Sequence, residues 1–192
     1  MATPRQLVET VAGVLGISVA TVIVHDRNLS TAPVPLRTVA GRGRAAAKIT
    51  AVDAANLLIA VTASESVKNS VWTVLTYGGL RGEKSKTTDT GIRSFDELPT
   101  HHTLGEFLAV LIDAVAVNEL RPKKFFSTVR FNGPRPGAEI QYTLPEMREA
   151  SIGYELKPKT KWSSESGDLF RTTEFSEETI LRVGAIVGDL ND

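Results

Sequence analysis

The sequence contains no cysteine. Its 192 residues therefore hold neither a disulfide framework nor a cysteine-ligated zinc site. A chain without cysteine is also typical of a reducing compartment.

The sequence also lacks a long hydrophobic run. The longest, Ala54–Ala63, includes Asn56 and Thr62 and is far shorter than the roughly 20 apolar residues of a membrane span. The first residues, Met1–Gln6, have neither the charged start nor the apolar core of a signal peptide. With 42% hydrophobic and 23% charged residues, the composition predicts a cytoplasmic globular protein that does not enter a membrane.

The chain has no net charge, but its charges are unevenly placed. Residues 1–50 carry six basic and two acidic side chains, a net charge of +4, and the remaining residues carry −4. A basic end on a neutral protein predicts contact with a polyanion there.

The first half of the chain reads as helices with one hairpin. Thr3 and Pro4 start a helix that Gly16 ends, and Ser18 caps a second helix that reaches Leu29. Two short strands, at 36–39 and 46–49, are expected to pair as a hairpin. Further helices are expected from Thr50, from Ser64 or Ser66 to Gly78–Gly79, and over 103–120. Residues 80–100 read as a mobile linker or surface loop, and the apolar Ala54–Ala63 segment as a central helix or a dimer seam.

The last third of the chain favours strands. The expected strands are Phe125–Phe131, Ala138–Leu144, Ile152–Leu156 and Leu169–Phe175, followed by a helix from about Ser176. The fold class is therefore α+β. Three domains are expected: a DNA-binding domain over 1–63, a helical linker or dimerisation region over 64–120, and a C-terminal α+β domain over 121–192. A dimer seam is expected on Ala54–Ala63 or on the helix at 103–120.

Residues 11–22, Val-Ala-Gly-Val-Leu-Gly-Ile-Ser-Val-Ala-Thr-Val, resemble the helix-turn-helix family of DNA-binding regulators. Ala12 is small where the helices cross, Gly16 permits the turn, and Ile17 and Val22 face inward. The resemblance implies that the second helix enters the major groove. Helical spacing makes five of its residues candidates for exposed DNA contacts: Ser18, Ala20, Thr21, His25 and Arg27.

The hairpin that follows carries a basic loop, Gly41-Arg42-Gly43-Arg44. Two helices followed by strand, basic loop and strand resemble the winged-helix variant of the same family. The loop also resembles the Arg-Gly-Arg core of the AT-hook motif, which implies minor-groove binding by Arg42, Gly43 and Arg44. Arg37 and Lys48, on the adjoining strands, are expected to contact phosphates.

Other candidate sites are weaker. His101-His102 has no further ligand at metal spacing and reads as surface capping at a helix entrance. Lys157–Trp162 is either a second polyanion contact or, more typically, an edge strand. Neither a phosphate-binding loop, a nucleophile elbow nor a catalytic carboxylate pair is recognisable, so we expect no enzyme, no metal and no cofactor.

The expected function is sequence-specific binding of double-stranded DNA by a homodimeric transcription regulator. Two symmetric second helices would then lie about one duplex turn apart. The C-terminal region is expected to dimerise, to sense a ligand or to recruit a protein. The alternatives are a phage-type DNA-packaging subunit that assembles into a ring, a protein-binding adaptor with an acidic partner, and a regulator that mimics or blocks another DNA-binding protein.

Overall fold

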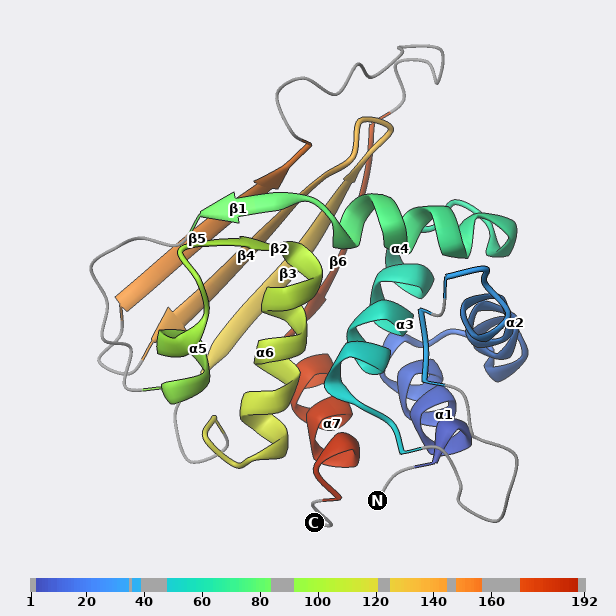
Figure 1. Cartoon of the computed structure of the whole chain (residues 1–192), viewed down its shortest axis with the longest axis horizontal. Coiled ribbons are helices and arrows are strands. Elements are labelled where there is room, and N and C mark those ends of the chain that lie inside the picture. Colours follow the sequence, from blue (N-terminus) through green and yellow to red (C-terminus); the bar gives the residue numbers. More distant parts are fainter. Residues whose placement is uncertain are drawn as a thin grey trace.

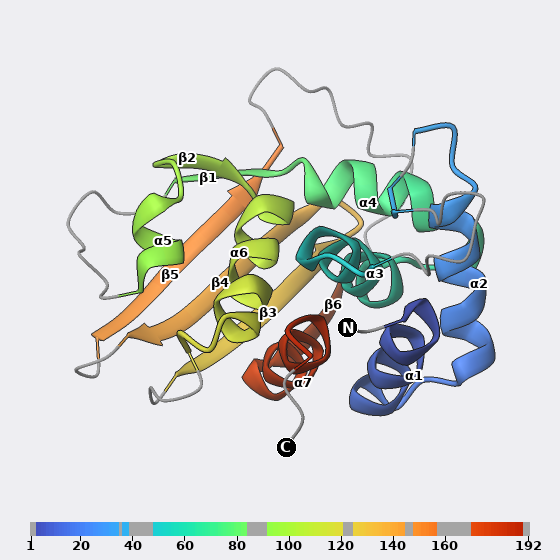
Figure 2. The ribbon, with the colours of Figure 1, turned by 60° about the horizontal axis from the view of Figure 1, so that its bottom comes forward.

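The computed structural model describes residues 3–34, 36–38, 48–83, 92–120, 125–144, 148–156 and 170–189. In these residues the chain has the predicted α+β class, with seven α-helices, one short 3-10 helix and a six-stranded antiparallel sheet. The helices gather on one face of the sheet, and the core lies between the two layers (Figures 1 and 2).

Two short helices joined by a tight turn open the chain. α1 (Pro4–Leu15) begins at Thr3, which forms a reciprocal capping box with Gln6. Gly16 ends α1 in a left-handed conformation, φ 64°, that favours glycine. α2 (Val19–Ser30) begins at Ser18, whose hydroxyl accepts the N–H of Thr21. The capping residues therefore predicted these helix ends to within one residue.

α3 (Ala51–Ala63) is the central helix of the fold. It begins where the sequence predicted, at Thr50, which forms a capping box with Asp53. It packs against α4 (Ser70–Gly78), which follows the 3-10 helix η1 (Val67–Asn69), and against α6 (Leu104–Ala116). The apolar sides of α3 and α6 are thus buried within one chain, and the predicted dimer seam on these helices is wrong.

The expected linker at 80–100 is structured wherever it is described. It contains β1 (Arg81–Glu83) and α5 (Arg93–Glu97), and β2 (His101–Thr103) follows it. The prediction of a linker failed because its few apolar residues are widely spaced and show no helical or strand period. Four of them are nevertheless buried in the core: Leu80, Ile92, Phe95 and Leu98.

The sheet has the strand order β2-β1-β5-β4-β3-β6. The sequence predicted its four long strands and the closing helix to within a few residues. Val129 pairs with Ile140, and Ile140 pairs with Ile152, so these side chains form one apolar row beneath the helices. The bounds are β3 (Phe126–Gly133), β4 (Gly137–Leu144), β5 (Arg148–Glu155), β6 (Arg171–Ser176) and α7 (Glu177–Val187).

The three expected domains contribute to one hydrophobic core. α1 packs against α7, and α3 packs against α6. The first helix of the chain therefore lies beside the last, as Figure 2 shows. Among the described residues, the segments 1–63, 64–120 and 121–192 have no separate cores.

Candidate nucleic-acid interface

The turn between α1 and α2 is held by both backbone and side-chain contacts. The carbonyl of Ala12 accepts the N–H of Ile17 across Gly16, with 3.0 Å between nitrogen and oxygen. Ala12 and Val22 are buried, and Ile17 packs against the core. These residues therefore take the inward positions that the helix-turn-helix resemblance implies.

α2 lies at the edge of the molecule, with α1, α3 and α4 on its inward side (Figures 1 and 2). Ser18, Ala20 and Arg27 are exposed, and Thr21 is half-buried. The hydroxyls of Ser18 and Thr21 lie 2.7 Å apart and bond to each other, which fixes the start of the helix. Four of the five candidate contact residues on α2 thus reach the surface.

The outward side of α2 is largely apolar. Val19 is 43% exposed, Ile23 51% and Val24 40%. Arg27 is the only basic side chain that α2 presents to solvent. A duplex would therefore meet one guanidinium within a mainly aliphatic surface, a composition that also suits a protein partner.

His25, the fifth candidate on α2, is buried, and its prediction as an exposed DNA contact is corrected. Its Nδ1 lies 2.8 Å from the hydroxyl of Ser70 on α4. That hydroxyl donates its proton to the carbonyl of Val67, so Nδ1 of His25 is the donor in the pair. Burial lowers the pKa of His25 below its ordinary value. The neutral ring thus ties α2 to α4.

Arg37 is also buried, and its prediction as a phosphate contact on a strand is corrected. Its Nε lies 2.6 Å from Oδ1 of Asp26 on α2, in an ion pair shielded from solvent. Burial raises the pKa of Asp26, the positive charge of Arg37 opposes the shift, and the nearby Asp53 adds to it. Arg37 therefore neutralises a carboxylate inside the protein.

The described ends of the expected hairpin are not strands. Side chains of α3 bind this backbone in place of a strand partner: Asp53 accepts the N–H of Thr38 at 2.6 Å, and Asn56 donates to the carbonyl of Leu36 at 2.8 Å. Lys48 is exposed in irregular chain just before α3. Arg42, Gly43 and Arg44, the expected wing tip, lie outside the described residues, as does the expected edge strand at Lys157–Trp162.

The histidine pair has a different place from the one expected. His101 is exposed, but His102 is fully buried on β2, with Nδ1 2.9 Å from the carbonyl of Pro99 and Nε2 2.8 Å from the hydroxyl of Tyr154. Its ring also stacks on Phe107. The prediction of surface capping therefore fails for His102, which is part of the core. In the described parts of the chain, no three His, Cys, Asp or Glu residues gather as metal ligands.

Sequence reasoning missed the polar residues that support the site. Asp26 pairs with Arg37, and Asp53 accepts the N–H of Thr38, so together they hold this segment against the helices. A lone Asp and Arg eleven positions apart give no pattern that pairs them before the chain is folded.

Among the described helices, none is long and apolar enough to cross a membrane.

Comparison with known proteins gives no relative. No family model, curated protein or solved structure matches this chain. Only its own residues therefore bear on its function.

Proposed function

We propose that the protein binds double-stranded DNA through α1 and α2, with α2 in the major groove. The observation that carries the proposal is the position of α2, which is packed on one side and exposed on the other. Its inward side is held by α1, α3 and α4, and its outward side faces solvent at the edge of the molecule. The major groove admits one α-helix, so a rigidly held edge helix is a suitable reader.

The charges near α2 support this assignment. Arg27 is exposed on α2, and Lys68 is exposed on η1. The side chain of Asn28 donates to the carbonyl of Val67 at 2.6 Å, which brings these two basic residues to the same edge. Lys48, Arg42 and Arg44 belong to the same basic part of the sequence. Phosphate contacts by such side chains would supply most of the affinity.

Four residues at the surface of α2 are assigned to base contacts. Ser18 and Thr21 offer hydroxyls, Ala20 offers a methyl group to thymine, and Arg27 offers a donor fork to guanine. Arg42 and Arg44 would hold the backbone or the minor groove. The proposed role is a sequence-specific transcription regulator that acts as a homodimer.

A protein-binding adaptor is the second candidate, favoured by the exposed aliphatic side chains of α2. Ile23 and Val24 would then dock on an apolar surface of the partner, and Arg27 would pair with an acidic residue on it. A ring-forming DNA-packaging subunit would share the DNA contact and differ in its solution mass.

The proposal is tested by selecting binding sites from a pool of random duplexes. We expect retention that falls steeply with salt, and one enriched palindromic site. Arg27→Ala should weaken binding to the enriched site by about 1–3 kcal/mol and relax the preference at one position, because a base contact is lost. Thr21→Ala should change sequence preference more than affinity for random duplexes.

Arg182→Ala is the matched control, because Arg182 is an exposed arginine paired with Glu178 on the distant helix α7. It should bind as the wild type does. If the wild type retains no duplex at low salt, the protein does not bind DNA. The adaptor then becomes the leading candidate.

A further inference from the structure

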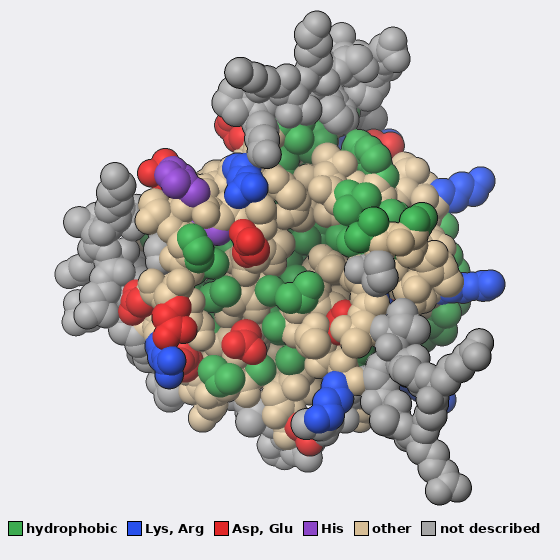
Figure 3. Space-filling view, in the orientation of Figure 1, with side chains coloured by type: hydrophobic (Ala, Val, Ile, Leu, Met, Phe, Trp, Pro, Cys, Tyr) green, Lys and Arg blue, Asp and Glu red, His purple; other side chains and the backbone are tan. Residues whose placement is uncertain are grey.

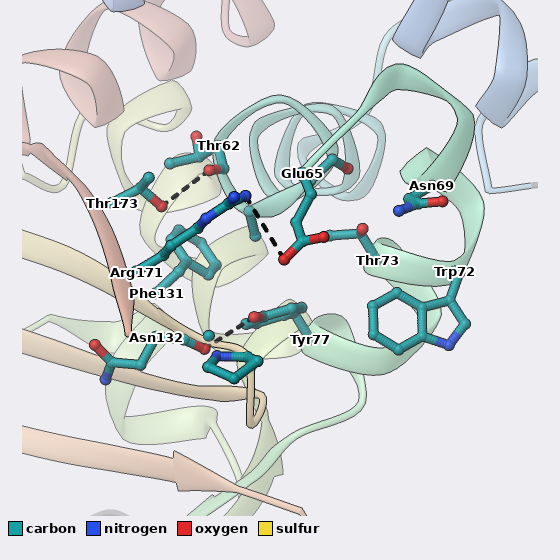
Figure 4. A pocket seen from close by; sticks show the side chains of 14 residues that line it. Thr62, Glu65, Asn69, Trp72, Thr73, Tyr77, Phe131, Asn132, Arg171 and Thr173 are labelled. Carbon is teal, nitrogen blue, oxygen red and sulfur yellow. Dashed lines mark hydrogen bonds and ion pairs between the residues drawn. The ribbon is translucent and has the colours of Figure 1, made fainter. Parts of the chain in front are cut away.

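A cavity of about 400 Å³ lies beside α4, and we call it the α4 cavity. Its walls come from the end of α3, from α4, and from the ends of β3 and β6 near the β3–β4 turn (Figure 4). Small-molecule sites in proteins have volumes of roughly 300–1,000 Å³. The α4 cavity is therefore large enough for a small organic ligand.

Aromatic side chains form one wall of the α4 cavity. Tyr77 and Phe131 meet edge to face, with ring centroids 5.8 Å apart. Trp72 also lines the cavity and is 50% exposed, so its ring lies at the opening. The hydroxyl of Tyr77 donates to the carbonyl of Asn132 at 2.8 Å, which fixes the ring, and burial raises the pKa of Tyr77 to about 12. This wall is uncharged and suits a flat apolar ring.

Two buried hydroxyls lie at the end of α3. Within the described part of the chain, Oγ1 of Thr62 and Oγ of Ser64 have no hydrogen-bond partner. Both residues line the cavity. The backbone around them is fixed, because Thr173 donates to the carbonyl of Thr62 at 2.9 Å. Because neither oxygen has accessible surface, these side chains shape the end of α3 and do not offer their hydroxyls to a ligand in the cavity.

Arg171 supplies the positive charge. It is the only basic residue among the described residues that line the cavity. Its Nη1 lies 3.7 Å from Oε1 of Glu65, which is too long for a hydrogen bond, and both side chains are more than half exposed. Figure 4 shows this pair above Tyr77. A ligand carboxylate that accepts two hydrogen bonds from the guanidinium can therefore displace Glu65 at little cost.

We propose that the α4 cavity binds a small aromatic carboxylate. The ring packs against Tyr77 and Trp72, and the carboxylate pairs with Arg171. The cavity and the outward side of α2 have no residue in common, so this site does not depend on the proposed DNA binding.

Calorimetric titration of the full chain with three probes tests the proposal. Indole-3-acetate has a ring and a carboxylate, tryptophan has an ammonium group in addition, and tryptamine has the ring and the ammonium group alone. We expect binding of the first two and at least a tenfold weaker affinity for tryptamine, about the worth of one charge-assisted hydrogen-bond pair. Arg171→Gln should weaken indole-3-acetate by about tenfold, and the control Arg182→Gln should not change it.

Thr62→Val is a second control. Because it removes an unpartnered buried hydroxyl that does not face the cavity, it should leave stability unchanged or raised and the affinity for indole-3-acetate unchanged. The proposal is overturned if none of the probes binds, if tryptamine binds as tightly as indole-3-acetate, or if Arg171→Gln binds as the wild type does. A circular dichroism spectrum of each variant shows that it is folded.

Discussion

Arg37 and Arg5 have the same side chain in opposite environments. Arg37 pairs with Asp26 in the interior, whereas Arg5 pairs with Glu9 on the surface of α1. Burial makes the first pair sensitive to the loss of a partner, because the remaining charge cannot be hydrated. Water and salt screen the second pair.

We therefore expect Arg37→Met to destabilise the protein by about 3 kcal/mol. Arg5→Met should change stability little. Urea unfolding of both variants measures the difference, and the double variant Asp26→Asn/Arg37→Met should recover part of the loss. Equal stability of Arg37→Met and the wild type would show that the pair is not buried in solution.

His25 makes stability depend on pH in a defined direction. Its pKa is lowered by burial from the ordinary value of 6.5, so between the two pKa values the unfolded chain binds more protons than the folded protein. The free energy of unfolding must therefore fall as pH is lowered through about 6.5.

His25→Asn tests this dependence, because the Asn amide nitrogen can replace Nδ1 as the donor to Ser70 without titrating. We expect the wild type to lose more stability than the variant when urea unfolding is repeated at about pH 7.5 and pH 5.5. Asp26, whose raised pKa acts in the opposite sense at lower pH, is common to both proteins. Parallel pH profiles would contradict a buried neutral His25.

At the scale of elements, the sequence was most informative where a helix has a cap. Thr3, Ser18, Thr50 and Thr103 each accept an N–H three residues on, and each starts a helix. Local signals of this kind do not depend on the rest of the fold.

The expected wing hairpin could not be judged from local sequence, because contacts with distant residues decide its conformation. Leu36–Thr38 has strand-forming residues, yet its backbone bonds to Asp53 and Asn56 of α3, which are fifteen or more positions away. β1 and β2 were missed for a related reason. Each has three residues, which is too short to show a period, and they are defined by pairing with each other and, for β1, with β5.

The contact between α6 and α7 depends on Gly184. A Cβ at this position would lie 2.5 Å from Cβ of Val115 and 2.9 Å from the carbonyl oxygen of Ile112. We expect Gly184→Ala to destabilise the protein by about 1–3 kcal/mol, because backbone and a branched side chain would have to move apart. The control is Gly13→Ala on α1, where no atom lies within 4 Å of the added methyl group.

Thermal unfolding of the two glycine variants measures this contrast. Gly13→Ala should be neutral or stabilising, since alanine is the better helix former. A Gly184→Ala variant as stable as Gly13→Ala would contradict close packing of α6 on α7.

The whole molecule is a two-layer fold with one covered and one open sheet face. On the open face Arg130 lies between Glu139 and Glu174, a charged arrangement suited to water. On the covered face one core joins helices from both ends of the chain. The four long strands could be predicted from their residue pattern, but this joint core could not, because no local pattern pairs α1 with α7.

The same limit applies to the two surfaces for which we propose functions. The outward side of α2 could be predicted in large part, because helical spacing alone separates Ala20 and Arg27 from Val22. The α4 cavity could not, because Thr62, Tyr77, Asn132 and Arg171 come from four elements far apart in sequence. The exposed side of a single helix can be predicted from the local sequence, whereas a cavity between layers cannot.

Amide chemical shifts of the isotope-labelled protein, recorded while a duplex pool is added at low salt, test the central claim most directly. If α2 enters the major groove, the largest changes lie between Gly16 and Thr31, while the open sheet face around Arg130, Glu139 and Glu174 stays unchanged. Changes centred on the sheet, or no change at any duplex concentration, would contradict DNA binding through α2.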